Sequence, residues 1–272
     1  MNNEHVYINE KFSSYLDNHQ ESFDFFMSLD GKEFRSVKER KTLQVKIGNN
    51  SFFVKKHFRT GYREILKNIF NFKLPILGAK NESIAIKKLD EIGIPTTPLV
   101  AYGEKGCSPA TKESFILTLD LGDIISLETL CKDWINSPPT LKFKRELINA
   151  VAELSGRFHS NGLHHRDFYL CHICLDSKLL KKGEIHLYLI DLHRAGVAKS
   201  ISETHQLKDL SALYFSAMHI GLSQRDILRF ILKYQKYFQQ NRLIPNSSFL
   251  KRVTARAIKL DEKYKRKYLP AA

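Results

Sequence analysis

The spacing of apolar residues changes near residue 120, and this change constrains the fold more than any other feature of the sequence. Before it, short segments alternate apolar and polar residues with a period of two, which is typical of strands. After it, apolar residues recur every three or four positions, which is typical of amphipathic helices. The order of the two patterns predicts an α+β protein with a small β-rich N-terminal part and a larger α-helical C-terminal part.

The β-rich part is expected over residues 23–120, after an N-terminal arm or short helix over residues 1–22. Residues 42–47 and 51–57 flank a Gly-Asn-Asn turn and therefore predict a β-hairpin. Further strands are expected near residues 34–37, 99–102 and 114–119, and helices over residues 61–72 and 80–92.

The helical part is expected over residues 121–272. Its clearest helix covers residues 140–160, where apolar residues recur at steps of four, three and four before Asn161-Gly162 ends it. Other helices are expected over residues 126–135, 205–240 and 248–268, and a short β-hairpin from strands at residues 173–175 and 185–190.

Two acidic residues follow regular elements and lie in loops. Asp167 ends the sequence His-His-Arg-Asp after the long helix, and Asp191 directly follows the apolar strand at 185–190. Two carboxylates joined by a hairpin can face one cavity. Phosphoryl transfer needs one to take a proton from the attacking hydroxyl and another to hold Mg²⁺ against the phosphates. The structural alternative is that Asp167 pairs with Arg166 or caps a turn.

Two earlier residues extend this pattern. Lys55 lies on an expected strand, and Glu82 lies on the helix expected after it. In protein-kinase-like folds a strand Lys pairs with a helix Glu and contacts the nucleotide phosphates, a His-Arg-Asp loop supplies the base, and a strand-end Asp binds Mg²⁺. Lys55, Glu82, Asp167 and Asp191 occur in this order, so they predict a protein-kinase-like two-lobe fold.

Longer stretches of sequence carry a family resemblance. They are residues 53–57, 75–79, 164–172, 190–195, 208–210, 213–216 and 220–227. With them the chain resembles the lipopolysaccharide core heptose kinases, specifically the heptose(I) kinases of Gram-negative bacteria, from about residue 23 to 268. The resemblance implies an ATP- and Mg²⁺-dependent phosphotransferase that acts on the first heptose of the inner core. Its acceptor is linked to lipid A at the cytoplasmic face of the inner membrane.

The resemblance also assigns roles by position. Asp167 resembles the catalytic base and Asp191 the metal-binding residue, while Lys55 resembles the phosphate-contacting Lys with Glu82 as its partner. His172 stands where protein kinases have a metal-binding Asn, and its imidazole replaces that ligand in part.

Four further residues complete the expected site. Asp209 resembles the buried helix residue that braces the catalytic loop. Arg166 and Arg194 are candidates for binding acidic groups of the acceptor, with loop bracing as the alternative. His193-Arg194 replaces the Phe-Gly of the protein-kinase switch, so constitutive activity is expected.

The glycine-rich loop that covers phosphates in protein kinases is missing. Residues 38–41, where it is expected, read Lys-Glu-Arg-Lys. Arg40 or Lys41 is therefore a candidate for contacting the ATP phosphates or the acceptor through its side chain. The alternative is a solvated turn.

The net charge of +14 is concentrated in two segments. Residues 32–73 contain twelve Lys and Arg against three acidic residues, and residues 251–272 contain eight against two. Basic segments attract polyanions, and beside a lipid A acceptor they fit an anionic membrane surface. An acidic protein such as an acyl carrier protein is a further candidate, a charged solvated face is the alternative for the C-terminal run, and no nucleic-acid partner is expected.

The sequence indicates a cytoplasmic protein that is peripheral on the membrane. It shows no membrane-spanning segment or secretory signal, and four Cys are too few for a disulfide scaffold. A metal site in the His- and Cys-rich stretch 159–174 is disfavoured because only one Cys-x-x-Cys pair occurs. Two alternatives stay open: a kinase for another acceptor (Kdo, a second heptose or a small molecule), and an inactive kinase-like module that binds anions.

Overall fold

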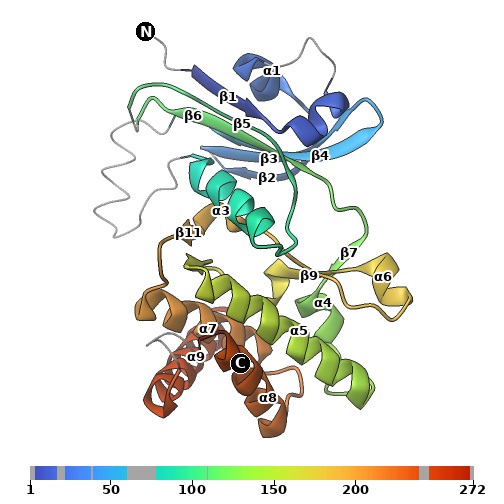
Figure 1. Ribbon diagram of the computed structural model, residues 1–272, viewed down its shortest axis with the longest axis vertical. Coiled ribbons are helices and arrows are strands. Elements are labelled where there is room, and N and C mark those ends of the chain that lie inside the picture. Colours follow the sequence, from blue (N-terminus) through green and yellow to red (C-terminus); the bar gives the residue numbers. More distant parts are fainter. Residues whose placement is uncertain are drawn as a thin grey trace. The chain divides into compact units, whose positions relative to one another are not determined.

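The structure is a computed structural model that describes residues 4–16, 22–37, 39–59, 78–108, 110–238 and 245–269 (Figure 1). Its contacts divide the chain into two compact units. Unit 1 comprises Met1–Lys87 and Thr97–Gly122, and unit 2 comprises Lys88–Thr96 and Asp123–Ala272. The helix expected over residues 61–72 lies outside the described residues.

Unit 1 is built on a six-stranded antiparallel sheet with the strand order β1-β5-β6-β4-β3-β2. The predicted hairpin is confirmed: β3 and β4 pair along their length and turn at Gly48, whose φ of 56° suits glycine. The strands are β1 (Glu4–Ile8), β2 (Lys32–Val37), β3 (Arg40–Ile47), β4 (Asn50–His57), β5 (Leu99–Lys105) and β6 (Glu113–Leu119).

The prediction of an N-terminal arm or short helix is wrong for residues 4–8. These residues form the edge strand β1, which pairs with β5, and Val6 and Ile8 pack on the buried core of the sheet. Only two aliphatic residues mark this short strand, so its alternation is too weak to detect in the sequence. A 3₁₀ helix, Glu10–Tyr15, and α1 (Phe23–Ser28) follow it.

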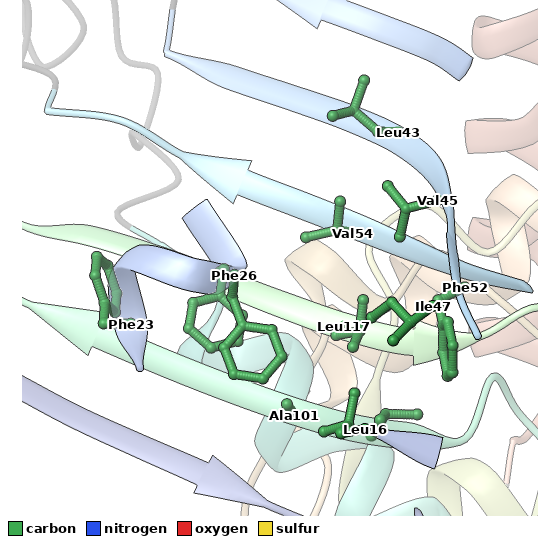
Figure 2. Close-up of a cluster of buried hydrophobic side chains, with 12 residues drawn as sticks. Leu16, Phe23, Phe26, Leu43, Val45, Ile47, Phe52, Val54, Ala101 and Leu117 are labelled. Carbon is green, nitrogen blue, oxygen red and sulfur yellow. The ribbon is translucent and has the colours of Figure 1, made fainter. Parts of the chain in front are cut away.

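The core of unit 1 lies on the face of the sheet that α1 covers (Figure 2). Alternate residues of β3 and β4 point into it, as their period of two predicted, and Phe26 of α1 stacks on Phe115 of β6 with 4.4 Å between ring centroids. The opposite face of β4 carries Ser51, Phe53, Lys55 and His57. The buried strand residues include Leu43, Val45, Ile47, Phe52 and Val54.

Helix α3 (Lys80–Glu91) forms where a helix was expected. Its start is tied to the sheet because the Ala79 amide donates to Ser114 Oγ of β6 at 3.0 Å. Gly93, with a φ of 63°, follows its end.

Unit 2 is mainly helical. The long predicted helix is α5 (Leu141–Ser160): Thr140 caps it by accepting from the Phe143 amide, and Gly162 turns the chain away with a φ of 78°. No Cβ fits at Gly162, because it would lie 1.9 Å from the Ala198 carbonyl oxygen. The other helices are α4 (Leu127–Cys131), α6 (Ser177–Lys181), α7 (Glu203–Ala217), α8 (Gln224–Gln235) and α9 (Ser247–Tyr268).

Short strands connect these helices. The predicted hairpin is β9 (Ile173–Asp176) with β10 (Leu187–Leu189), and β7 (Ile124–Ser126) pairs with β9 on its other side. The helix predicted over residues 126–135 is shorter than expected. Ser126 caps α4, which ends at Cys131, and residues 132–136 form turns in which the Trp134 amide donates to the Cys131 carbonyl at 3.1 Å. Two-residue strands β8 (Leu163–His164) and β11 (Gly196–Val197) flank the loops of the site. Among the described helices, none is both long and apolar enough to cross a membrane.

Candidate active site

The predicted pair of Lys55 and Glu82 forms within unit 1. Lys55 lies on the face of β4 away from the α1 core, and its Nζ is 2.6 Å from Glu82 Oε1 in the first turn of α3. The Glu82 side chain is only 3% exposed, against 18% for Lys55. A buried carboxylate needs such a cation, since leaving it unpaired would be costly. The pair therefore fixes an ammonium group at a defined point on the sheet.

The next residue, Lys56, has a different environment. Its Nζ donates to the carbonyl oxygens of Met27, at 2.8 Å, and Leu29, at the C-terminal end of α1. Burial lowers the pKa of this ammonium below its usual value, with Lys41 adding to the effect. Because successive residues of a strand point to opposite faces, one lysine reaches α3 and the other reaches α1.

The two basic candidates near residue 40 also separate. Both lie in β3 rather than in the loop that the sequence suggested. Lys41 is opposite Lys56 and forms an ion pair with Glu33 of β2 at 3.3 Å, so it lies on the other face from Lys55. Arg40 has the parity of Thr42, which pairs with Lys55, and so shares the Lys55 face. The structure thus does not bring Lys41 to Lys55.

In unit 2, Asp209 of α7 braces the backbone of the loop that carries Asp167, as expected. Its two carboxylate oxygens accept from the backbone N–H groups of His165 at 2.6 Å and Arg166 at 2.8 Å. Burial alone would raise the pKa of Asp209, but hydrogen bonds from His159 and the loop lower it overall. Arg166 has a φ of 70°, which is strained for a side chain larger than glycine, and the Asp209 contact stabilises this turn.

Asp167 has the guanidinium group of Arg194 as its partner. Arg194 Nη1 lies 2.8 Å from Asp167 Oδ1, and the arginine side chain is 45% exposed. The sequence suggested Arg166 as the competing partner and Arg194 as a ligand of the acceptor. The structure instead places Arg194 on the candidate base, and links Arg166 to Asp209 through its backbone.

His172 lies between the two acidic residues. Its Nδ1 is 2.7 Å from the Asp167 carbonyl oxygen, which can only accept, so Nδ1 carries the proton. Nε2, on the other side of the ring, lies 3.7 Å from Asp191 Oδ2. The Ile190 amide donates to the His172 carbonyl at 2.9 Å, which ties the end of β10 to this loop.

Two further histidines, His165 and His193, contact residues 190 and 191 at the end of β10. His165 Nε2 donates to the Ile190 carbonyl at 3.0 Å, and burial lowers the pKa of His165, so its ring is neutral. His193 Nδ1 lies 2.7 Å from Asp191 Oδ1. The sequence noted His193 only as a replacement for a Phe of protein kinases. Its spacing of two residues from Asp191 was the one signal that could have predicted this contact.

Asp191 and His172 together fit a metal ion carried by a nucleotide. Among the described residues there is no group of three or more His, Cys, Asp or Glu side chains placed to hold a metal. Mg²⁺ needs no such group, because it is commonly bound by one or two carboxylates together with substrate phosphates and water. The Asp191 carboxylate is therefore a suitable ligand for Mg²⁺ beside phosphate oxygens and water, whereas an imidazole such as that of His172 is a less usual one.

Comparison with known proteins extends these observations to nearly the whole chain. A family model described as the lipopolysaccharide kinase (Kdo/WaaP) family matches residues 24–234. The chain is 40% identical over 251 residues to the lipopolysaccharide core heptose(I) kinase WaaP of Escherichia coli, covering 92% of this chain and 95% of that protein. It is also 40% identical over 250 residues to the protein of the same name from Pseudomonas aeruginosa, covering 92% and 93%.

A solved structure supports the fold. It is described as WaaP in complex with acyl carrier protein, has a TM-score of 0.78 and 35% identity, and covers 94% of this chain and 99% of that chain. The expected α+β two-lobe fold of the protein-kinase-like type is confirmed.

Proposed function

Because the chain belongs to the lipopolysaccharide kinase (Kdo/WaaP) family, we propose that it transfers the γ-phosphoryl group of ATP to the first, inner heptose of the lipopolysaccharide core. The observation that carries this proposal is its 40% identity to two heptose(I) kinases over 92% of its length. We further propose that residues 23–120 and 121–272 are the N- and C-lobes of this enzyme.

Asp167 is the proposed catalytic base. It orients the heptose hydroxyl and takes its proton as the oxygen attacks the γ-phosphorus. Arg194, whose Nη1 lies 2.8 Å from Asp167 Oδ1, orients this carboxylate before the acceptor binds. An exposed guanidinium group in this place is also suited to an anionic group of the acceptor, and Arg166 is a second candidate for that contact.

Asp191 and His172 are the proposed ligands of the nucleotide's metal ion. When bound, Mg²⁺ neutralises charge on the β- and γ-phosphates. Lys55, held by Glu82, donates to the phosphates, and Arg40 is proposed to add a second cation on the same face of the sheet. The Asp209 brace holds the backbone on which Asp167 is carried.

The test is transfer of labelled γ-phosphate from ATP to purified core acceptors. Acceptors with an unphosphorylated inner heptose should be labelled, and acceptors in which that heptose already carries phosphate should not. Labelling of both would indicate another acceptor group, such as Kdo or a second heptose. If no acceptor is labelled while ATP still binds, the chain is an inactive anion-binding module.

An acyl carrier protein is a proposed partner. Helix α9 carries most of the basic C-terminal segment, which suits an acidic protein.

Unit 2 also contains a cavity of about 170 Å³ whose lining is mostly apolar and includes Trp134, Phe230 and Val253. We place the acyl group of the partner there. Since each buried CH₂ contributes about 0.8 kcal/mol, the acylated carrier should bind at least tenfold more tightly than the unacylated carrier in calorimetry. Equal affinities of the acylated and unacylated carriers would show that the cavity does not bind the acyl group.

Peripheral contact with the cytoplasmic face of the inner membrane is proposed on charge alone. Each Lys or Arg near an anionic surface contributes about 1 kcal/mol of attraction, which salt weakens. Flotation with vesicles that contain anionic lipid should therefore decrease as salt is added. Flotation that does not respond to salt would contradict an electrostatic attachment.

A further inference from the structure

We propose that His193 is a positioning residue that fixes the orientation of the metal-binding carboxylate of Asp191 by a hydrogen bond to Oδ1. Its Nδ1–H binds Asp191 Oδ1, and this contact directs Oδ2 toward His172. The inference rests on the proposed function, in which Asp191 binds the nucleotide's Mg²⁺. It assigns a role to a side chain that the proposed mechanism does not use.

The contact has the geometry of a charge-assisted hydrogen bond. Nδ1 and Oδ1 are 2.7 Å apart, and because an ionised carboxylate can only accept, Nδ1 is the protonated nitrogen. The His193 side chain is only 10% exposed, against 30% for Asp191. The imidazole is therefore held by its packing, and the more exposed carboxylate follows it.

The backbone brings these two residues together. Asp191 has φ 59° and ψ 55°, in the left-handed region that few residues other than glycine adopt. The chain then enters a single 3₁₀ turn, Leu192–Arg194, in which Leu192 is buried and the Ala195 amide donates to the Leu192 carbonyl at 2.9 Å. This sharp reversal turns the His193 ring back toward the carboxylate two residues earlier.

The second carboxylate oxygen then faces His172. Oδ2 lies 3.7 Å from His172 Nε2, while the other ring nitrogen, Nδ1, donates to the Asp167 carbonyl. Each of the two proposed ligands thus has an outer partner: His193 for Asp191 and the Asp167 backbone for His172. The torsion that rotates a carboxylate is broad, so a fixed donor at Oδ1 is what selects one orientation. Loss of such outer partners commonly weakens metal affinity 10- to 100-fold.

The experiment measures ADP binding by calorimetry over a range of Mg²⁺ concentrations and again in EDTA, with the full chain. His193→Leu should weaken the Mg²⁺-dependent part of the affinity about tenfold and leave binding in EDTA unchanged. His193→Asn, whose amide can donate from near the position of Nδ1, should restore affinity to within about threefold. His193→Gln, whose amide lies further out, should behave like His193→Leu.

A matched control removes another His–Asp contact of the same unit. His219 Nε2 lies 2.9 Å from Asp261 Oδ1, so His219→Leu deletes a comparable contact outside the site and should leave Mg²⁺ dependence unchanged. Thermal melting of each variant reports whether it is folded. If His193→Leu does not fold, the comparison of the Asn and Gln variants still decides the outcome.

Three outcomes would overturn the inference: unchanged Mg²⁺ dependence in His193→Leu, equal losses with and without Mg²⁺, or an Asn variant as impaired as the Gln variant. Asp191→Asn separates this inference from the proposed function. If Asp191→Asn loses Mg²⁺-dependent binding and His193→Leu does not, only the positioning role fails. If Asp191→Asn also keeps it, the proposed metal site fails and the positioning role fails with it.

Discussion

The functional side chains of unit 1 and those of unit 2 are held in different ways. In unit 1, Lys55 and Glu82 meet through one ion pair between a strand and a helix. In unit 2, Asp167 and Asp191 lie in loops whose conformation depends on a buried carboxylate and on two residues with positive φ, Arg166 and Asp191. Regular elements can present a side chain by their periodicity alone. Loops need hydrogen bonds from distant residues to do the same.

The difference has a consequence for mutations. Removing one residue of the unit 1 pair breaks the ion pair between Lys55 and Glu82. Residues of the unit 2 network share partners, since His172 contacts the Asp167 backbone and faces the Asp191 carboxylate. Coupled groups of this kind give non-additive effects in double-mutant cycles. The predictions below test this contrast in order of the expected size of the effect.

The largest effect is expected in the unit 2 network. Asp167→Ala and Asp191→Ala should each lower kcat at least ~10²-fold, because one removes the proton acceptor and the other a metal ligand. Circular dichroism and thermal melting should show a folded protein. The double variant should be little worse than either single variant. Near-normal turnover in either single variant would contradict the proposed roles, and additive losses would contradict the coupling.

A smaller effect is expected for the unit 1 pair. Glu82→Gln keeps the shape of the side chain but removes the charge that holds Lys55. A hydrogen bond to a charged group contributes about 1.5–3 kcal/mol, so the KM for ATP should rise about tenfold or more. Steady-state kinetics at saturating acceptor measure it.

Lys56→Met is the control for that variant on the same strand. It removes the donor to the Met27 and Leu29 carbonyls and should reduce the free energy of unfolding by about 1–3 kcal/mol without changing the KM for ATP. A raised KM for ATP in Lys56→Met, or an unchanged one in Glu82→Gln, would contradict the argument that one face of β4 serves ATP binding and the other serves stability.

A modest effect is expected from the neighbouring strand. Arg40→Ala should raise the KM for ATP by a few-fold, roughly the loss of one exposed charged contact of up to 1 kcal/mol. Lys41→Ala should leave it unchanged, because Lys41 lies on the opposite face and pairs with Glu33. An equal rise of the KM for ATP in both variants would show that the face of the strand does not decide which residue contacts ATP.

The smallest effect concerns stability and pH. Burial lowers the pKa of His164 from 6.5 to about 4, and the stacked ring of His205, 3.7 Å away between centroids, adds to this. A lowered pKa in the folded state means that the unfolded chain binds a proton first as pH falls. The contribution of neutral, buried His164 to the free energy of unfolding is therefore complete above pH 6.5 and is lost progressively as the pH falls toward 4.

The variant His164→Phe keeps an aromatic ring against His205 and cannot be protonated. Its melting temperature should fall less than that of the wild type between pH 7 and pH 5. An equal fall in both proteins would show that His164 does not contribute to the acid sensitivity of unit 2.

Much of the fold could be predicted because its signals are local. The alternation in β3 and β4, the cap and stop of α5 and the helical part after residue 120 all follow from patterns within a few residues. Strand β1 and helix α6 were missed because they are short, and the helix predicted over residues 126–135 was too long because α4 ends at Cys131 and turns follow it. Pairing partners far along the chain are not visible in a local pattern.

The site shows the same division. The order of Lys55 and Glu82 on a strand and the helix after it predicted a real contact, and the family resemblance predicted the brace at Asp209. The partner of Asp167 was missed, since Arg166 is adjacent in sequence whereas Arg194 is 27 residues away. His193 was missed as well, because its contact depends on the left-handed backbone of Asp191.

The sequence by itself determined which chemical groups are present, their order along the chain and the elements that carry most of them. Those properties follow from the residue types and from the periodic spacing of apolar residues within short stretches of the chain. Tertiary structure alone decided which of Arg40 and Lys41 shares a face of the sheet with Lys55, which arginine contacts Asp167, and which imidazole contacts Asp191 Oδ1. These choices depend on strand parity and loop conformation, which contacts between distant residues stabilise and which no short stretch of sequence contains.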